Sequence, residues 1–274
     1  MAGNMVSVIL VNYNGEGYLR KCLRSIDDHA EGVPYEVVVV DNASTDGSRE
    51  IIRREFPDVT LIESDDNSGF SRGNSLGAQN ASGKYLLFLN TDAYFIENSM
   101  KVLAGYMEEH ATVAAVGPVL VFEDGRFQLS AGKLPNVWVE FTDKIVYTLD
   151  RQGRGTLSGI FRWLFRHTQR TGWITGACMM VRRSAFEQIG GFDEKMFMYY
   201  EDKDICKRIA EAGWQVVYYT GTTVVHLLGG SAASLQHGLV NRRYRTSQVY
   251  YYQKHLGAFQ TALLQAYLRL TGKA

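Results

Sequence analysis

The sequence has few cysteines and no excess of either charge, and both absences limit what the chain can be. Its three cysteines, Cys22, Cys178 and Cys206, lie far apart among apolar residues, which favours reduced, buried thiols over a disulfide framework or a metal knuckle. A cytosolic compartment is therefore the default expectation. The 29 basic and 29 acidic residues balance, so we do not expect the chain to bind nucleic acid.

Long hydrophobic runs are missing as well. No apolar run approaches the roughly 20 residues that cross a bilayer, and the opening MAGNMVSVIL has neither the charged start nor the cleavage site of a signal peptide. Acidic residues are absent from 212–274, where the charged residues are Arg242, Arg243, Arg245, Lys254, Arg269 and Lys273. We therefore expect any contact with a membrane to be made from its surface, and the C-terminal part to face something anionic.

Short β-rich runs alternate with helical patterns over the first part of the chain. The runs VSVILVNY, YEVVVVD, VTLIES and KYLLFLN are apolar on both faces, which is typical of parallel strands covered by helices. Between the first two runs, EGYLRKCLRSIDD places its apolar side chains on one helical face. This order predicts an α/β fold whose mostly parallel central sheet is flanked by helices.

The length of 274 residues slightly exceeds that of one compact domain. We predict one domain over residues 1–240 and a helical C-terminal extension over 241–274, with an insertion at about 122–171, where the alternation is lost. Beyond the insertion we expect a strand in WITGACMMVRR, a helix from Ser184, and two strands, WQVVYYT and TTVVH.

The insertion contains the pattern of a basic amphipathic helix. Apolar side chains recur at helical spacing and arginines recur every four residues, namely Leu157, Ile160, Phe161, Leu164 and Phe165 against Arg162, Arg166 and Arg170. Two interpretations are open. Either the helix packs on the domain with its arginines outward, or it binds a membrane surface or the acceptor of a reaction.

Polar clusters follow the four apolar runs. They are Asn12 to Gly15, Asp41 to Asp46, Asp65 to Gly69, and Asn90 to Asp92. Such residues also favour turns and helix N-caps, so each cluster alone has a structural explanation. Ligands of parallel sheets, however, bind outside the carboxyl ends of the strands, and four clusters at one edge indicate a binding site.

One candidate for this site is a dinucleotide-dependent dehydrogenase. Gly15 and Gly17 follow the first strand, and Asp41 ends the second strand, where an acid that binds ribose would stand. Arg20, however, occupies the position of the third glycine of that motif. This interpretation also gives no role to the polar residues after the fourth strand.

The other candidate is a site for a nucleotide sugar. Transfer of a sugar from a nucleoside diphosphate needs a pocket for the nucleoside, a cation for the diphosphate and a general base for the acceptor hydroxyl. Asp41 is placed to hold the ribose or base, and Asp92 to hold Mg²⁺ or Mn²⁺, which take few protein ligands. His226, at the end of TTVVH, is a candidate second ligand, although a lone histidine there also has a structural explanation.

The segment MYYEDKDI supplies the candidate base. The pattern DKDICKRIAEAG predicts a helix that begins near Asp202 and stops at Gly213. A carboxylate at a helix N-terminus is favoured in the ionised form that a base needs, so Asp202 is the candidate. Asp204 complements the helix dipole, and Glu201 is placed to bind donor or acceptor hydroxyls. The structural alternative is that all three carboxylates only complement the dipole.

Six motifs resemble those of a known family. They are VSVILVNYNGEGYLRKCLRSI, VVVVDNASTDGS, NSGFSRGNSLGA, LLFLNTDA, TGACMMVRRSAFEQIGGFDEKMFMYYEDKDICKRIAEAGW and VVHLLGGS. In this order they look like family 2 glycosyltransferases with the GT-A fold, and most like the bacterial rhamnosyltransferase-like subgroup that builds polysaccharides. The resemblance runs from about Val6 to Ser231 and is weakest between Phe122 and Arg170.

The resemblance implies a donor site at the strand ends. The residues that match positions around the nucleoside and diphosphate are Asn12, Tyr13, Asp41, Asn67 and Arg72. Gly176 matches a position on the strand that flanks the transferred sugar, and Asn90 counts among the residues that bind substrate.

The resemblance also implies a cation site and a catalytic pair. Asp92 matches the last position of the metal-binding acidic motif, and His226 matches the histidine that completes the site. Because Asn90 is neutral, the chain departs from a two-aspartate motif, which bears on metal affinity. Glu201 and Asp202 match the Glu-Asp pair, with Asp202 as the base.

The implied enzyme is an inverting glycosyltransferase that depends on a divalent cation. Its donor would be dTDP-rhamnose or, alternatively, a UDP-hexose, and its acceptor a saccharide, lipid-linked in our interpretation. With one base and no second positioned nucleophile, a single displacement is expected. The alternative from another class is a non-catalytic subunit that binds nucleotide sugars. The neutral Asn90 favours this alternative, whereas the joint presence of a base, a metal ligand and a histidine opposes it.

The C-terminal segment NRRYRTSQVYYYQKHLG mixes arginine and tyrosine as interfacial segments do. One hypothesis is peripheral association with the cytoplasmic face of the cell membrane. The other is a helix packed on the domain or on a second subunit of a homodimer. Near the candidate base, Phe197, Tyr199 and Tyr200 are expected to wall the acceptor sugar, although core packing explains Phe197 equally well.

Overall fold

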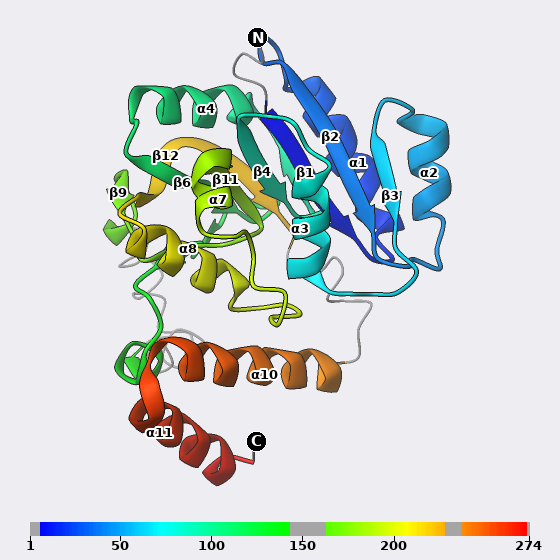
Figure 1. Ribbon diagram of the computed structural model, residues 1–274. Coiled ribbons are helices and arrows are strands. Elements are labelled where there is room, and N and C mark those ends of the chain that lie inside the picture. The colour runs from blue at the N-terminus through cyan, green and yellow to red at the C-terminus, as the bar shows by residue number, and fades with distance from the viewer. Residues whose placement is uncertain (1–5, 143–162, 228–236, 273–274) are drawn as a thin grey trace.

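The structure is a computed structural model that describes residues 6–142, 163–227 and 237–272 (Figure 1). Strands and helices alternate in its first part, as predicted. The elements are β1 (Val6–Asn12), α1 (Glu16–Asp28), β2 (Tyr35–Asp41), α2 (Ser48–Glu55), β3 (Thr60–Glu63), α3 (Phe70–Gln79) and β4 (Tyr85–Leu89). These strands pair in parallel in the order β3-β2-β1-β4. The prediction of a parallel sheet is confirmed for this part of the chain.

The sheet continues beyond β4 with mixed directions. The further elements are β5 (Ala93–Phe95), α4 (Ser99–Glu109), β6 (Val113–Val121), β11 (Cys178–Arg182), α7 (Arg183–Gln188), α8 (Glu201–Glu211) and β12 (Gln215–His226). β11 runs antiparallel to both β4 and β6, whereas β12 lies parallel to β6 and antiparallel to β5. The antiparallel pairing of β12 with β5 brings the chain after β4 and the end of β12 to the same place.

One strand replaces the two that were expected near the C-terminal end of the domain. WQVVYYT and TTVVH form a single β12, whose register against β6 shifts between Tyr218 and Thr223. Gly221 lies within that irregularity, and a Cβ there would come 2.3 Å from the Tyr219 ring. The Tyr219 ring stacks on Tyr106 of α4 at 4.2 Å between centroids. The glycine therefore makes room for this packing and does not end a strand.

The insertion adds short strands at the side of the sheet. They are β7 (Phe127–Gln128), β8 (Ala131–Gly132), β9 (Gln169–Arg170) and β10 (Trp173–Ile174). The expected amphipathic helix does not reach Arg170, which lies in β9 and pairs with β12. The strand forms because Gln169 and Arg170 pair with Tyr218 and Val217 of β12, and the Phe165 ring packs nearby on Phe127 and Tyr218. Residues 157–162 of that pattern lie outside the described residues.

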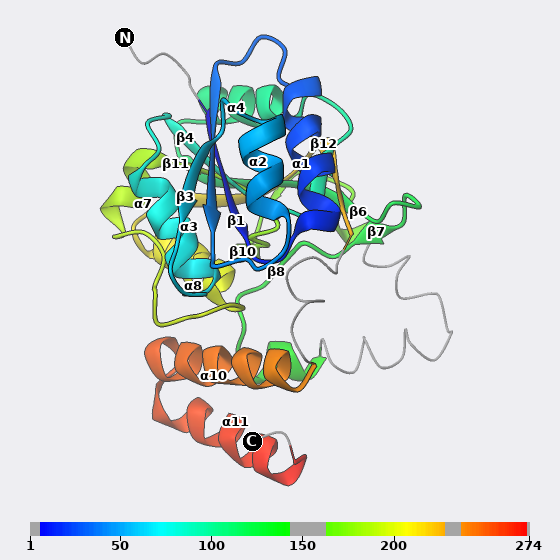
Figure 2. The same cartoon turned by 90° about the vertical axis from the view of Figure 1, so that its right-hand side faces the viewer.

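Helices cover both faces of the sheet, and neighbouring strand residues alternate between two apolar clusters. Val8 and Leu10 of β1 pack on the side of α1, α2 and α4, whereas Ile9 packs on the side of α3, α7 and α8. Figure 2 shows α1 and α2 on one side of the strands and α3, α7 and α8 on the other. The three cysteines are buried and free, as predicted.

Two helices, α10 (His237–His255) and α11 (Gly257–Leu270), form a layer below the sheet (Figures 1 and 2). They share a separate apolar cluster with the loop before α8, whose buried members are Met196, Tyr200, Tyr251, Tyr252, Leu264 and Leu268. Because Tyr200 is 1% exposed within this cluster, its ring does not wall a sugar site. The position of the boundary between domain and extension stays a prediction. No helix in the described ranges is long and apolar enough to cross a membrane.

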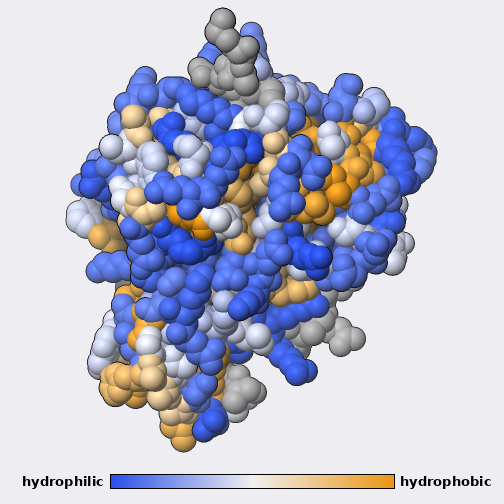
Figure 3. Space-filling model, in the orientation of Figure 1, coloured by the Kyte–Doolittle hydropathy of each residue, from blue (hydrophilic) through white to orange (hydrophobic). Residues whose placement is uncertain are grey.

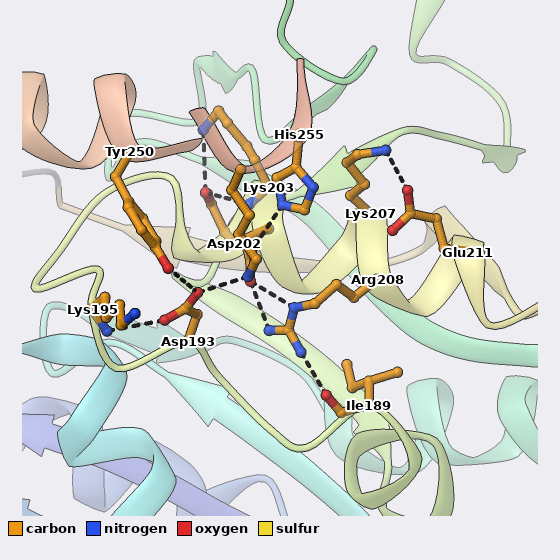
Figure 4. A network of polar contacts seen from close by, with 12 residues as sticks. Ile189, Asp193, Lys195, Asp202, Lys203, Lys207, Arg208, Glu211, Tyr250 and His255 are labelled. Atoms are coloured by element: carbon orange, nitrogen blue, oxygen red, sulfur yellow. Dashed lines mark hydrogen bonds and ion pairs between the residues drawn. The ribbon is translucent and has the colours of Figure 1, made fainter. Parts of the chain in front are cut away.

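A buried carboxylate joins α10 to α8. Asp204 has no exposed surface, and its oxygens accept bonds of 2.7 Å from Arg208 Nε, Lys254 Nζ and His255 Nε2. Lys254 also donates to Asp193, at 2.7 Å. We call these five residues the Asp204 network, and Figure 4 shows His255 pointing from α10 toward α8 and Arg208.

The network changes the acidity of Asp204. Burial raises its pKa, but the bonds from His255, Arg208 and Lys254 outweigh burial and lower it from 3.8 to about 2. A carboxyl whose pKa is depressed by folding stabilises the fold above its unfolded pKa, and this stabilisation is lost as the pH falls toward the folded pKa. Asp204 therefore contributes at neutral pH and loses its contribution between about pH 4 and pH 2.

We predict that Asp204→Asn lowers the free energy of unfolding by about 2–4 kcal/mol at pH 7, because it removes the fully buried charge that pairs with Arg208 and Lys254. Urea denaturation measures this quantity. The matched control is Glu211→Gln on the same helix. The Glu211 side chain pairs with Lys207 and is 56% exposed, so the free energy of unfolding should change by no more than about 0.5 kcal/mol. Equal effects of the two variants would contradict the assignment.

Candidate active site

The carboxyl ends of β1 and β2 are tied together by a buried aspartate. Asp41 has no exposed surface, and its carboxylate accepts bonds from Asn12 Nδ2 at 2.8 Å, Ser44 N at 2.9 Å and Arg49 Nε at 2.6 Å. Tyr13 follows Asn12 directly in the chain and is half-buried. The structure thus brings the predicted residues Asn12, Tyr13 and Asp41 to one edge, with the Asp41 oxygens already engaged by the protein.

The start of α3 extends this edge. Asn42 Nδ2 donates to Gly69 O at 3.0 Å, and the Asn67 side chain accepts from Gly69 N at 3.2 Å. Gly69 has φ +90°, and a Cβ there would come 2.4 Å from Phe197 O, so the position requires glycine. Phe70 N donates to the same Phe197 oxygen at 2.7 Å. The loop before α8 is therefore fixed to the beginning of α3.

Arg72 lies on the first turn of α3, exposed to solvent. Among the described residues, no carboxylate forms an ion pair with Arg72. Its guanidinium can therefore bind a ligand at the strand ends without first breaking an ion pair. The role that the resemblance implies for Asn67 and Arg72 stays a prediction.

Asp92 and His226 meet although 134 positions separate them in the chain. Asp92 Oδ1 lies 3.3 Å from His226 Nε2, and both side chains are almost fully buried. Asn90 Nδ2 lies 3.4 Å from the same nitrogen. The antiparallel pairing of His226 with Ala93 produces this juxtaposition. The predicted pair of metal ligands is thus assembled by the sheet.

Gln128 sets the orientation of the His226 ring. Its Nε2 donates to the backbone oxygen of His226, which can only accept, so its Oε1 faces His226 Nδ1 at 3.1 Å. Nδ1 then carries the ring proton, and the lone pair of Nε2 points toward the Asp92 carboxylate. Sequence reasoning missed Gln128, because nothing in its surroundings signals a contact 98 positions away.

These residues fit a divalent cation. Two ligands at adjacent corners of an octahedral Mg²⁺ or Mn²⁺ site stand roughly 3 Å apart, close to the Asp92–His226 separation of 3.3 Å. A third His, Cys, Asp or Glu does not join them among the described residues. Water and phosphate oxygens would have to complete the shell, as is common for Mg²⁺. Asn90 offers a neutral amide oxygen if its side chain rotates.

The candidate base lies at the start of α8, behind a strained turn. Tyr199 and Tyr200 have φ of +67° and +66°, a conformation that costs a non-glycine residue about 1 kcal/mol or more. Asp202 is 8% exposed, and its Oδ1 accepts from Lys203 N at 2.8 Å and from Lys203 Nζ at 3.2 Å. Lys203 in turn lies over the Trp173 ring, 4.2 Å from its centroid. Helix α8 begins at Glu201, one residue before the predicted start at Asp202.

Gly176 lies beside this carboxylate, but not on a strand as expected. It occupies the turn between β10 and β11, where the chain reverses before entering the sheet. A Cβ at Gly176 would come 3.2 Å from the Phe70 ring and 4.0 Å from Asp202 Cβ. The absence of a side chain at Gly176 therefore allows Phe70 of α3 and the candidate base to pack closely around this turn.

Glu201 differs sharply from its neighbour. Burial, and then repulsion from the Asp202 charge, raises the pKa of Glu201 to about 8. Its Oε2 is buried without a hydrogen-bond partner in the described part of the chain. At neutral pH Glu201 is therefore mostly protonated and can donate a hydrogen bond.

A basic residue of α10 also reaches this region. The Arg243 guanidinium carbon lies 3.5 Å from the centroid of the Phe197 ring. Burial lowers the pKa of Arg243, and electrostatic attraction to Tyr13 partly offsets that effect. Sequence reasoning noted the basic character of this segment without assigning Arg243 to the site.

The mixed sheet, with polar residues at the carboxyl ends of its parallel strands, has the GT-A fold of solved glycosyltransferases. A solved structure of the mannosyltransferase PcManGT from Pyrobaculum calidifontis, in complex with GDP-Man and Mn²⁺, superposes with a TM-score of 0.58 at 19% identity, over 98% of this chain and 80% of that one. GalNAc-T7 with UDP, GalNAc and Mn²⁺ gives a TM-score of 0.60 at 18% identity, over 89% of this chain and 48% of that one.

Sequence comparison then gives the family. The model described as glycosyl transferase family 2 matches residues 7–190, and the chain belongs to this family. A second model, glycosyl transferase family group 2, matches residues 137–271. This membership removes the dehydrogenase interpretation.

Two curated relatives have names that specify the sugar. The chain is 27% identical to N-acetylglucosaminyl-diphospho-decaprenol L-rhamnosyltransferase of Mycobacterium tuberculosis, over 95% of this chain and 88% of the relative. It is 26% identical to rhamnosyltransferase WbbL of Escherichia coli K12, over 81% of this chain and 83% of the relative.

Proposed function

We propose that this protein transfers L-rhamnose from dTDP-rhamnose to a lipid-diphosphate-linked saccharide during bacterial polysaccharide synthesis, with inversion at the anomeric carbon. The observation that carries the proposal is the placement of Asp202 at the start of α8, where its Cβ lies 4.0 Å from the position that a Cβ would take at Gly176. The names of the two relatives supply the sugar and the type of acceptor. A UDP-hexose is the alternative donor, and a screen of nucleotide sugars for hydrolysis separates the two.

In the proposed reaction Asp202 acts as the general base. It takes the proton of an acceptor hydroxyl while that oxygen forms a bond to the anomeric carbon of the donor. The bond from this carbon to the diphosphate oxygen breaks, and the nucleoside diphosphate leaves with the electron pair. Because Glu201 is neutral at the start, it is a poor nucleophile and a suitable hydrogen-bond donor to a sugar hydroxyl, which favours one displacement over two.

Asp92 and His226 would hold a Mg²⁺ or Mn²⁺ ion in this site, with Asn90 beside them. When bound, such a cation neutralises charge that develops on the leaving diphosphate. Asn12, Tyr13, Asp41, Asn67 and Arg72 would position the nucleoside and diphosphate from the neighbouring strand ends. The engaged carboxylate of Asp41 supports an indirect part for this residue, through Asn12 and the backbone of Ser44.

We propose that the protein works at the cytoplasmic face of the cell membrane. Large apolar side chains are exposed on α11 and on the helical residues 137–142 beside it: Trp138, Phe141, Phe259, Leu263 and Leu270. Figure 3 shows apolar surface gathered over α11 at the foot of the molecule. Together with the absence of acids from 212–274, this surface fits peripheral binding to an anionic bilayer. The same surface would alternatively join two copies in a homodimer.

For Asp202→Asn we predict that the turnover number falls by about 10³-fold or more, because the amide cannot take the proton. The dissociation constant for the donor should stay within about twofold, since the side chain keeps its shape. Glu211→Gln, at the far end of the same helix, is the control. Normal turnover in the Asp202→Asn variant would show that Asp202 is not the base. If the unaltered protein shows no turnover with any nucleotide sugar, the non-catalytic subunit is favoured.

For Asp92→Ala we predict that donor binding no longer responds to Mn²⁺. Calorimetric titration of the donor with and without Mn²⁺ should show an affinity gain of about tenfold or more in the unaltered protein and almost none in the variant. Asn90→Asp, which adds a carboxylate next to His226, should increase the gain. If Asp92→Ala keeps the full response to Mn²⁺, the cation site lies elsewhere.

For the membrane surface we predict that the protein sediments with anionic liposomes at low salt and is released at high salt. The double variant Phe259→Ser/Leu263→Ser should reduce the bound fraction several-fold. Ile96→Ser, which alters an apolar side chain that is 49% exposed next to β5, should not. If the double variant instead converts a dimer to a monomer in light scattering and liposomes never bind, the surface serves the homodimer.

A further inference from the structure

A hollow of about 250 Å³ lies between the start of α10 and the loop before α8. It is lined by Lys195, Phe197, Arg242, Arg243, Thr246 and Ser247, and we call it the α10 pocket. Three of its six lining residues are cationic and none is acidic. Nothing in the proposed roles of Asp202, Asp92 or His226 uses it.

The cations of the α10 pocket lack counter-charges. Within the described ranges, no carboxylate forms an ion pair with Lys195, Arg242 or Arg243. Lys254, on the same helix, shows the contrast, because it pairs with both Asp193 and Asp204. A larger hollow of about 500 Å³ beside α1 also contains cations, but Arg20 and Lys21 there pair with Glu55 and Glu123. The α10 pocket is thus an attractive place for an anion that the described residues do not supply.

Arg243 provides a second indication of a ligand. Its Nη1 is buried and has no hydrogen-bond partner among the described residues, while its planar face rests on the Phe197 ring. A buried guanidinium N–H without an acceptor is unfavourable, and an anion in the pocket would satisfy it. The two hydroxyls of the pocket are already donating, Ser247 to Met198 O at 2.9 Å and Thr246 to Arg242 O at 3.0 Å. The donors left for a ligand are therefore the three cations.

The pocket adjoins the candidate base through one loop. Phe197, which forms its wall, accepts the bond from Phe70 N, and the Phe70 ring packs beside Gly176, next to Asp202. The pocket is on the α10 side of this loop. The exposed apolar side chains of α11 belong to the same helical layer. An anionic group held here would lie between the candidate base and the proposed membrane surface.

We propose that the α10 pocket binds the diphosphate of the lipid-linked acceptor through Lys195, Arg242 and Arg243. The inference rests on the proposed function, in which the diphosphate of the donor is assigned to the cation at Asp92 and His226. A second diphosphate group on the other substrate then needs a separate set of positive charges. Guanidinium groups suit it because they bind phosphate oxygens in pairs. The pocket thus selects acceptors by their diphosphate and directs their lipid toward α11.

The direct test is calorimetric titration of inorganic pyrophosphate in the presence of EDTA, so that no divalent cation contributes. The double variant Lys195→Gln/Arg242→Gln should bind pyrophosphate at least about tenfold more weakly than the unaltered protein, because two charge-assisted contacts are lost. The matched control Arg245→Gln removes a charge from the same helix that bonds to Gln248 and does not line the pocket. It should change the affinity less than twofold. Equal binding by all three proteins overturns the proposal.

Kinetics identify which substrate brings the diphosphate. With the double variant, the KM for a lipid-diphosphate-linked acceptor should rise about tenfold while the KM for the nucleotide sugar stays within twofold. A rise in the donor KM alone means that the pocket holds the diphosphate of the donor, and this overturns the acceptor assignment. If the unaltered protein transfers no sugar, the proposed function fails, while the pyrophosphate titration still decides whether the pocket is an anion site.

Discussion

The buried carboxylate of Asp41 is the contact on which the candidate active site depends. By accepting bonds from Asn12, Ser44 and Arg49, it fixes the ends of β1 and β2 to each other. Asn42, the next residue, holds the loop at Gly69, and Phe70 holds Phe197. A continuous series of hydrogen bonds therefore runs from the second strand to the loop that presents Asp202. Donor positions and base are built as one unit, so a change at Asp41 should disturb both.

The start of α8 gathers several unfavourable features in a few residues. Two consecutive tyrosines adopt left-handed backbone conformations, a glutamate is buried, and its Oε2 has no partner among the described residues. Packing of Tyr200 among Tyr244 and Tyr251, and its hydrogen bond to Glu140, offsets this cost. The arrangement keeps Glu201, a carboxyl with a raised pKa, directly beside the candidate base Asp202. Such a pair suits a site that must take a proton from one hydroxyl and donate a hydrogen bond to another.

Local patterns predicted the first four strands and the start of α8, because apolar periodicity is a local property. The pairing of Asp92 with His226 was expected from strand-end chemistry and from the family resemblance. Local patterns failed where distant contacts decide. The need for glycine at position 221 becomes clear only from the nearby Tyr219 ring. The location of Gly176 outside a strand becomes clear only from the turn that leads into β11. Arg170 joins a sheet because β12 is there to pair with it. Gln128 and Arg243 approach the site through the insertion and α10, and a single sequence carries no signal of such an approach.

The Asp204 network has a consequence for how the protein is made. Asp204 lies 50 and 51 positions before Lys254 and His255, two of its three partners. Once His226 has been made, all the described strands of the sheet are present, but α8 still lacks its contacts with Lys254 and His255 of α10. The order of synthesis thus places the attachment of the helix that carries Asp202 after the last strand of the sheet.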